Sequence, residues 1–107
     1  MYCFVLYKIY DRFTEMLPGF NHNLNVEGVL FHVQTEDKGV DTAIVETHVF
    51  VGGAIVCVKK TSYDEWMLYP DRRERVGQLM KVQHKTLLKQ LANKEVPEAK
   101  AFLKKSS

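Results

Sequence analysis

The sequence predicts an α+β fold in which a four-stranded antiparallel sheet, made of two hairpins, packs on one long C-terminal helix. From Phe20 onward apolar and polar residues alternate, which is the period of a half-buried strand. Two short turn sequences, EG at 27–28 and GG at 52–53, each separate two such runs. After Tyr63 the period becomes that of an amphipathic helix. The predicted element order is therefore β-β-β-β-α.

Residues 16–107 are predicted to form a single α+β domain, because a chain of 107 residues holds one modest core and is too short for two ordinary domains. Residues 1–15 are predicted to be an N-terminal extension or an extra strand, since residues 2–10 are aromatic and β-branched on both faces. Met16 stands directly before LPGF, where the alternation begins, so a start-site artefact is the alternative interpretation of the first fifteen residues.

The first hairpin, residues 20–35, is predicted to bury one of its two faces. A two-residue turn at 27–28 sets the register, because each residue before the turn then opposes one residue after it. Asparagine is a poor strand former, yet it recurs at every second position on the face predicted to point outward. The predicted pairs are Val26–Val29, Leu24–Phe31, His22–Val33 and Phe20–Thr35 on the inward face, and Asn25–Leu30, Asn23–His32 and Asn21–Gln34 on the outward face.

The second hairpin follows a loop, EDKGVD, that begins at Glu36. The runs TAIVETHVF and AIVCVKKTSY flank a Gly-Gly pair that is typical of a tight primed turn. Whether the two hairpins pair with each other through their inner strands is left open by the sequence. The predicted pairs are Val49–Val56 and Thr47–Val58 on the better core face, and Phe50–Ile55, His48–Cys57 and Glu46–Lys59 on the mixed face.

The C-terminal region is predicted to contain the long helix. DEWMLYP reads as an irregular or short helical connection, and Asp71 with Glu74 has the spacing of a capping box. Asn93 is predicted to end the helix, Pro97 prevents simple continuation, and EAKAFLKK is a short second helix or a frayed tail. The apolar stripe consists of Val76, Leu79, Met80, Leu87, Leu88 and Leu91, and a separate stripe consists of Lys81, Lys85 and Lys89.

Charge is distributed unevenly along the chain. Residues 1–71 carry five Lys/Arg and ten Asp/Glu, and residues 72–107 carry ten and three, so the net charges of −5 and +7 sum to +2. This distribution admits an acidic partner without requiring one. The two cysteines form no CxxC pair, which favours a reducing cytoplasm. MYCFVLYKIY lacks signal-peptide features and is shorter than the roughly 20 apolar residues of a membrane span. We therefore expect a soluble, cytoplasmic protein without a membrane partner.

The sequence predicts no enzyme activity, no catalytic residues, and no metal or other cofactor. It contains no GxSxG, GxxxxGK[ST] or GxGxxG motif. The predicted His48–Cys57 pair, with His32 nearby, comes closest to a metal or nucleophile site, but it has no HxH, HxxxH or CxxC spacing. His22 and His84 are predicted to be buried, hydrogen-bonded histidines, with each other as the candidate partner across the sheet–helix interface.

A non-enzymatic binding or adaptor domain is the predicted function, acting through protein–protein interaction or self-association as a homodimer. The outward face is rich in hydrogen-bonding groups, and it is also predicted to expose Leu30, Ile44, Phe50 and Ile55. Apolar residues grouped on an outer sheet face mark interaction sites. The candidate binding-surface residues are Asn21, Asn23, Asn25, His32, Gln34, Glu46, His48, Phe50, Lys59 and Lys60.

Single-stranded nucleic-acid binding is the alternative function, using the sheet face and the basic helix. The lysine stripe and nearby basic residues could neutralise phosphates, and exposed aromatic rings could stack on unpaired bases. The basic residues are Lys59, Lys60, Arg72, Arg73 and Arg75 together with the lysine stripe, and the rings are those of Phe50, Tyr63 and Trp66.

The segments GFNHNL, FHVQTED, THVFVGGAIVCVKKTSY and LMKVQHKTLLKQL together resemble a family of small bacterial proteins, common among delta-proteobacteria. The family carries the pattern GFNHN, HVQTED, THxFxGGxI, KKTSY and LMxxQHK, and the resemblance covers roughly residues 19–91. It implies no established activity, cofactor or catalytic residue. The site candidates that fall within the matched motifs are His22, His32, Gln34, Glu36, His48, Lys59, Lys60, Gln83 and His84.

Overall fold

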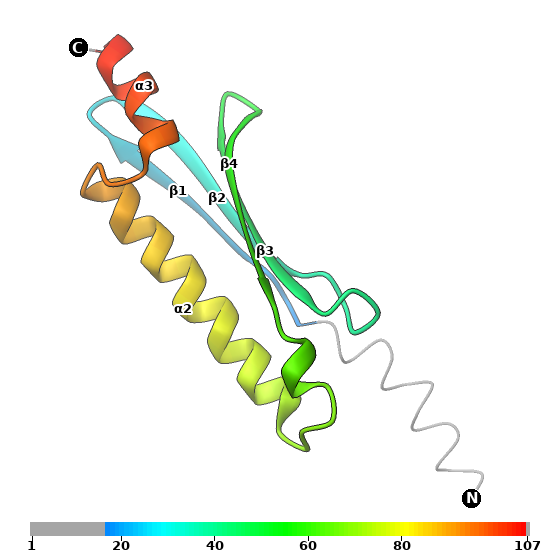
Figure 1. The fold of residues 1–107 in the computed structure, drawn as a ribbon. Helices are drawn as coiled ribbons and strands as arrows, with labels where there is room; N and C mark the ends of the chain where they lie inside the picture. Colours follow the sequence, from blue (N-terminus) through cyan, green and yellow to red (C-terminus); the bar gives the residue numbers. More distant parts are fainter. Residues whose placement is uncertain (1–16, 107) are drawn as a thin grey trace, which may run out of the picture.

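The computed structural model of the chain describes residues 17–106 and confirms the predicted α+β fold (Figure 1). The predicted extension or extra strand in residues 1–15 lies outside the described residues. The elements are β1 (Phe20–Val26), β2 (Val29–Asp37), β3 (Ile44–Val51), β4 (Ala54–Ser62), the short 3-10 helix η1 (Asp64–Trp66), α2 (Arg72–Ala92) and α3 (Pro97–Ser106).

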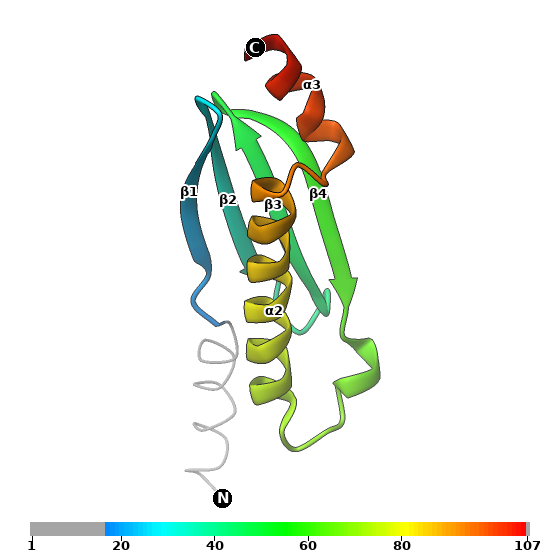
Figure 2. The same cartoon turned by 90° about the vertical axis from the view of Figure 1, so that its left-hand side faces the viewer.

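The four strands form one antiparallel sheet in the order β1-β2-β3-β4, so the two hairpins do pair through β2 and β3. Helix α2 crosses one face of this sheet and contacts β1, β2 and β3, while α3 packs on β2 and β4 near the hairpin turns (Figure 2). The first hairpin has the predicted register at every pair. Its turn residues Glu27 and Gly28 have φ values of 51° and 87°, which are typical of a primed hairpin turn.

The predicted register of the second hairpin is wrong beyond Phe50, because β4 contains a β-bulge. Phe50 faces Ile55 as expected, but Val49 faces Cys57, which leaves Val56 as the extra residue. The bulge lets Val56 and Cys57 both pack against the core, which simple alternation would forbid. Every later residue of β4 therefore changes sides. The observed pairs are His48–Val58, Thr47–Lys59 and Glu46–Lys60.

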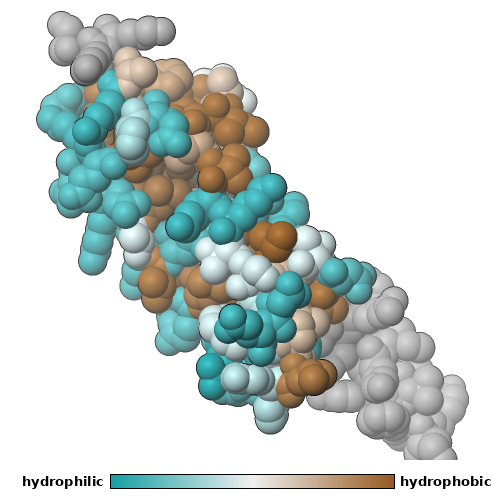
Figure 3. Space-filling model, viewed as in Figure 1, coloured by the Kyte–Doolittle hydropathy of each residue, from teal (hydrophilic) through white to brown (hydrophobic). Residues whose placement is uncertain are grey.

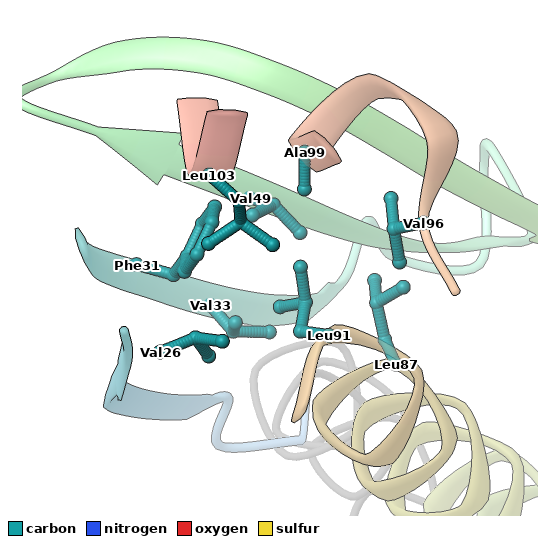
Figure 4. Close-up of a cluster of buried hydrophobic side chains, with 9 residues drawn as sticks. All are labelled: Val26, Phe31, Val33, Val49, Leu87, Leu91, Val96, Ala99 and Leu103. Carbon is teal, nitrogen blue, oxygen red and sulfur yellow. The ribbon is translucent and has the colours of Figure 1, made fainter. Parts of the chain in front are cut away.

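The core consists of two apolar clusters, one at each end of the sheet–helix interface. The cluster near the hairpin turns joins the sheet with the end of α2 and with α3. Side chains from all three parts point toward one another in Figure 4. The second cluster lies near the start of α2 and includes Val45, Tyr63 and Met80. The residues of the first cluster are Val26, Phe31, Val33, Val49, Leu87, Leu91, Val96, Ala99 and Leu103.

The C-terminal helices largely follow the prediction, with one correction at the start of α2. Asp71 occupies the N-cap position but makes no side-chain cap bond, so the predicted capping box is wrong. The carboxylate of Asp71 instead accepts a 3.0 Å bond from Nε of Arg75, four residues later. Asn93 is the C-cap as predicted, and residues 97–106 form the short second helix.

The loop between the hairpins lies two residues further along the chain than predicted, because β2 continues through Glu36 and Asp37 and β3 begins only at Ile44. Asp37 is buried, and its Oδ1 accepts bonds from the Tyr63 hydroxyl at 2.7 Å and from the Gly39 N–H at 3.0 Å. These bonds compensate the carboxylate for its loss of water. Burial, followed by the bond to Asp37, raises the pKa of Tyr63.

Two glycines offer a matched test of backbone packing. A Cβ on Gly19 would lie 2.6 Å from the backbone oxygen of Thr35, whereas a Cβ on Gly77 of α2 would lie 3.7 Å from Cδ1 of Leu17. Gly19→Ala should therefore lower the free energy of unfolding by about 1–2 kcal/mol, since a backbone atom must shift. Gly77→Ala should raise it by about 0.5–1 kcal/mol through helix propensity. Urea denaturation of both variants tests the pair, and equal effects would contradict it.

Candidate functional site

The sheet face that points away from α2 carries nine of the ten predicted surface residues, and several of them touch in a row across the strands. Nδ1 of His32 lies 2.8 Å from Oδ1 of Asn23, and its Nε2 lies 3.2 Å from Oδ1 of Asn21. On its other side the His32 ring contacts Phe50, with 6.0 Å between the ring centroids.

The row continues from Phe50 toward β4. The ring of His48 stacks on Phe50 at 5.7 Å and 13° between planes. Nε2 of His48 lies 3.3 Å from Oε1 of Glu46, whose Oε2 lies 3.7 Å from Nζ of Lys60. The connected residues Asn21, Asn23, His32, Phe50, His48, Glu46 and Lys60 are named the outer row.

The other three predicted surface residues, Gln34, Asn25 and Lys59, do not belong to the outer row. Gln34 donates a 2.7 Å bond to Glu36 on the same face. Oδ1 of Asn25 accepts a 3.0 Å bond from the Gly28 N–H, so this side chain stabilises the hairpin turn. Lys59 was predicted to point outward, but the β-bulge moves it to the helix side, where Thr47 is its strand partner.

An apolar patch adjoins the outer row and shares Phe50 with it. Leu30 and Ile55 are 55% and 58% exposed, as predicted, and Val58 is 42% exposed because the bulge turns it outward. Phe50 and Ile44 are half-buried rather than exposed. Hydrophobic residues also gather around the β3–β4 hairpin in the view of Figure 3. The apolar patch is defined here as Leu30, Phe50, Ile55 and Val58.

The bulge also separates the two groups of the expected thiol–imidazole pair. His48 faces Val58 on the outward side, whereas Cys57 faces Val49 and packs against the core. Burial, followed by the charge of Glu98, raises the pKa of the Cys57 thiol, which keeps it protonated. Within residues 17–106 no three His, Cys, Asp or Glu side chains converge as metal ligands would.

A second polar arrangement lies beneath α2, between the two apolar clusters. Nδ1 of His22 lies 2.7 Å from Nε2 of His84, which confirms the predicted contact between these histidines, although His22 itself is exposed. Nδ1 of His84 lies 2.7 Å from the hydroxyl of Thr35, which lies 2.7 Å from that of Thr47. The histidine pair is thus one end of a longer chain of bonds.

From Thr47 the series of bonds continues to Gln83 of α2. Its Nε2 donates to the Thr47 hydroxyl at 2.9 Å and to the Lys59 backbone oxygen at 3.2 Å. Its Oε1 accepts a 2.6 Å bond from the Thr61 hydroxyl. Every strand therefore contributes one side chain, and α2 contributes two. The residues His22, His84, Thr35, Thr47, Gln83 and Thr61 are named the buried polar chain.

One direction of donation satisfies the whole buried polar chain. Thr47 accepts from Gln83, so its own hydroxyl donates to Thr35, whose hydroxyl then donates to Nδ1 of His84. A neutral His84 carries its proton on Nε2 and donates it to His22. Burial, followed by the charge of His22, lowers the pKa of His84, which favours this neutral form. Among the residues that the structure describes, no buried side-chain nitrogen or oxygen lacks a partner.

Sequence reasoning missed Thr35, Thr47 and Thr61 as members of this chain. A signal was present, because Thr35 and Thr47 fall on inward strand positions and two polar residues interrupt the apolar stripe of α2. Inward polar residues on facing elements must find hydrogen-bond partners. The β-bulge hid the role of Thr61, which simple alternation had placed on the outward face.

Of the basic residues named as candidates for phosphate binding, Lys60 lies in the outer row, but the lysine stripe lies on the other side of the sheet. The side chains of Lys81, Lys85 and Lys89 are exposed on α2, which covers the opposite face of the sheet. Tyr63 is 1% exposed, so the expectation that it could stack on a base is wrong. The guanidinium carbon of Arg75 lies over the Trp66 and Tyr69 rings, 5.9 Å and 4.7 Å from the ring centroids.

No helix in the described part of the chain combines the length and hydrophobicity that a membrane crossing requires. Comparison of the chain with protein-family models, curated proteins and solved structures finds no match.

Proposed function

We propose that the chain is a non-enzymatic binding domain that engages a protein partner through its outward sheet face. The observation that supports this most strongly is the apolar patch beside the outer row. Leu30 and Ile55 expose more than half of their surface on a sheet face that could have been wholly polar. Exposed apolar side chains that group together and are bordered by polar residues are typical of protein interfaces.

The outer row supports the same proposal through its order. His32, Phe50 and His48 are held by ring contacts and by bonds to neighbouring side chains. Side chains that are already fixed lose little entropy when a partner covers them. The apolar patch would then supply most of the binding energy, and the outer row would orient the partner.

The contacts within the outer row favour recognition over catalysis. A site for nucleophilic catalysis needs a nucleophile and a base, with a donor for the developing charge, that converge on one reacting atom. In the outer row each polar group instead contacts its neighbour along a line, from Asn21 on β1 to Lys60 on β4. This linear arrangement suits a partner that lies along the face.

Replacing Ile55 with glutamate should weaken partner binding at least about tenfold, because a buried charge would replace an apolar anchor. Val82 offers a matched control, since it is 59% exposed on α2 and Ile55 is 58% exposed on the opposite side of the molecule. The wild-type chain would first be used to capture and identify a partner. Calorimetric titration of that partner into wild type, Ile55→Glu and Val82→Glu then measures the three affinities and tests whether the partner binds the outward sheet face. Equal loss in both variants, or no loss in either, would contradict the proposal.

Single-stranded nucleic-acid binding is the alternative proposal, and it has less support. Lys60 is the one lysine of the outer row and is paired with Glu46, while the lysine stripe lies across the sheet. Anisotropy of labelled single-stranded DNA and RNA at two salt concentrations separates the two proposals. Binding that falls steeply with salt and weakens in Lys60→Ala would favour nucleic acid.

A further inference from the structure

The outer edge of β1 presents regular backbone groups that pair with no other strand in residues 17–106. The two-residue turn makes Val26 and Val29 a hydrogen-bonded pair, because a two-residue hairpin closes on such a pair. Hydrogen-bonded and non-bonded pairs then alternate along the ladder. The backbone N–H and C=O groups of Asn21, Asn23 and Asn25 therefore point away from β2.

An independent bond gives the same assignment. The N–H of Lys38 donates to the backbone oxygen of Ile44 at 2.9 Å, so even-numbered positions along this strand direct their backbone toward β3. Odd-numbered positions of β2 therefore face β1. Their partners in β1 include His22 and Leu24, which leaves the asparagines facing the free edge.

Within residues 17–106 the β4 edge of the sheet carries protective features that the β1 edge lacks. Strand β4 contains the β-bulge, carries Lys59 and Lys60, and is partly covered by α3. Bulges, lysines and covering helices are the devices by which proteins prevent edge strands from pairing. Strand β1, FNHNLNV, has no bulge, no proline, and no Asp, Glu, Lys or Arg.

We propose that β1 pairs antiparallel with β1 of a second copy of this chain, around a two-fold axis at Asn23. The pattern of β1 is the same in both directions about this residue, because asparagines lie two positions to either side. A two-fold axis there places Asn23 opposite Asn23 of the second copy and Asn21 opposite Asn25. The axis also places Asn25 opposite Asn21, which makes three hydrogen-bonded pairs. Together they would add on the order of six backbone hydrogen bonds.

The side chains of β1 suit a second copy. A strand without formal charge does not repel itself, and amide side chains both donate and accept hydrogen bonds. On the inward face His22 would lie opposite Leu24 of the second copy; within its own chain Leu24 packs against the first apolar cluster and His22 contacts His84. The interface is therefore isologous, as most dimer interfaces are.

The dimer would change the surface available to a partner, although the inference does not rest on the proposed function. Two four-stranded sheets would become one eight-stranded sheet. Both outer rows and both apolar patches would face the same side, related by the two-fold axis. A partner of the outward face would then meet two equivalent sites.

The first experiment measures the mass of the full chain in solution by light scattering. We expect twice the 12.4 kDa of one chain. Asn23→Pro removes an N–H that faces the free edge, and Asn23→Lys sets two like charges against each other. Both variants should be monomeric, while Lys60→Pro at the β4 edge should stay dimeric. A monomeric wild type, or a dimeric Asn23→Lys, would overturn the proposal.

Disulfide trapping tests the register. In a chain with Cys3→Ser and Cys57→Ser, Asn23→Cys should cross-link to itself on mild oxidation, because Cα atoms of a hydrogen-bonded pair lie about 5.5 Å apart. Asn25→Cys alone should not cross-link, but it should link to Asn21→Cys when the two proteins are mixed. Cross-linking of Asn25→Cys to itself as fast as Asn23→Cys would overturn the two-fold axis at Asn23.

Discussion

Replacing Thr35 with valine is expected to lower the free energy of unfolding by about 2–4 kcal/mol, although the two side chains have nearly the same shape. Thr35 is 0% exposed and lies between His84 and Thr47 in the buried polar chain. Valine would leave Nδ1 of His84 without a donor and the Thr47 hydroxyl without an acceptor. Both groups would remain buried, and each unsatisfied buried group costs about 1–3 kcal/mol.

Thr61→Val is the matched control for this prediction. Thr61 makes the same kind of bond, 2.6 Å to Gln83. It is half-buried at the end of the buried polar chain, so water can replace its hydroxyl as a donor to Gln83. We expect a loss of at most about 1 kcal/mol from Thr61→Val. Urea denaturation at neutral pH measures both variants. If Thr35→Val costs no more than Thr61→Val, the buried polar chain does not stabilise the fold as a connected unit.

The double variant Thr35→Val/Thr47→Val sharpens the test. Removing Thr47 as well takes away one of the groups that the first substitution leaves unsatisfied. The cost of the double variant should therefore be smaller than the sum of the two single costs, by about 0.5–3 kcal/mol. A simple sum would mean that the two hydroxyls act independently, which their 2.7 Å separation argues against.

The position of the buried polar chain explains why α2 has a defined position on the sheet. It lies between two apolar clusters, whose contacts are less directional than hydrogen bonds. Gln83 and His84 bond to threonines of β2 and β3, and a shift of α2 by one turn would leave all four groups unpaired. A fully satisfied polar network can specify one arrangement of a core, because the alternatives leave buried groups without partners.

The first hairpin could be predicted pair by pair because its register depends on local information alone. A two-residue turn allows one alignment, and alternation then assigns each side chain to a face. The contact between His22 and His84 followed from the same alternation and from the stripe of α2. These features depend on residues close together in sequence or on a simple period.

The second hairpin could not be predicted in full because a β-bulge depends on tertiary packing. Simple pairing put Cys57 and Lys59 on the outward face, and the register with a bulge puts them on the helix side. The choice between these registers is decided by whether Val56 and Cys57 can both reach the core, which alternation cannot reveal. The capping box failed for a different, local reason, since the Asp71 carboxylate pairs with Arg75 four residues later.

Lowering the pH should destabilise the fold through His84, and the sign follows from its lowered pKa. Burial, followed by the charge of His22, lowers the pKa of His84 below its ordinary value of about 6.5. As the pH falls through about 6.5, the unfolded chain takes up a proton that the folded chain does not. The contribution of His84 to the free energy of unfolding should therefore fall, with a slope of at most about 1.4 kcal/mol per pH unit.

The buried polar chain gives this loss a structural cause. Nδ1 of a neutral His84 accepts the hydroxyl of Thr35, so a proton added there would place two donors face to face. The Thr35 hydroxyl would have to turn and donate to Thr47, which already accepts a bond from Gln83. The Thr47 hydroxyl would then have no acceptor within the buried polar chain. The cost of protonating His84 is thus spread over the hydrogen bonds that join β2 and β3 to α2.

Urea denaturation of wild type and His84→Gln between pH 8 and pH 5 measures the effect. His84→Gln should be less stable than wild type at pH 8, because the bonds to Thr35 and His22 are altered. Its stability should depend less on pH, by up to the slope of one proton. Equal slopes in the two proteins would show that His84 does not carry the dependence. If the free energy of unfolding of His84→Gln depended more steeply on pH than that of wild type, another group would titrate on unfolding. Acid would then not act by disrupting the buried polar chain.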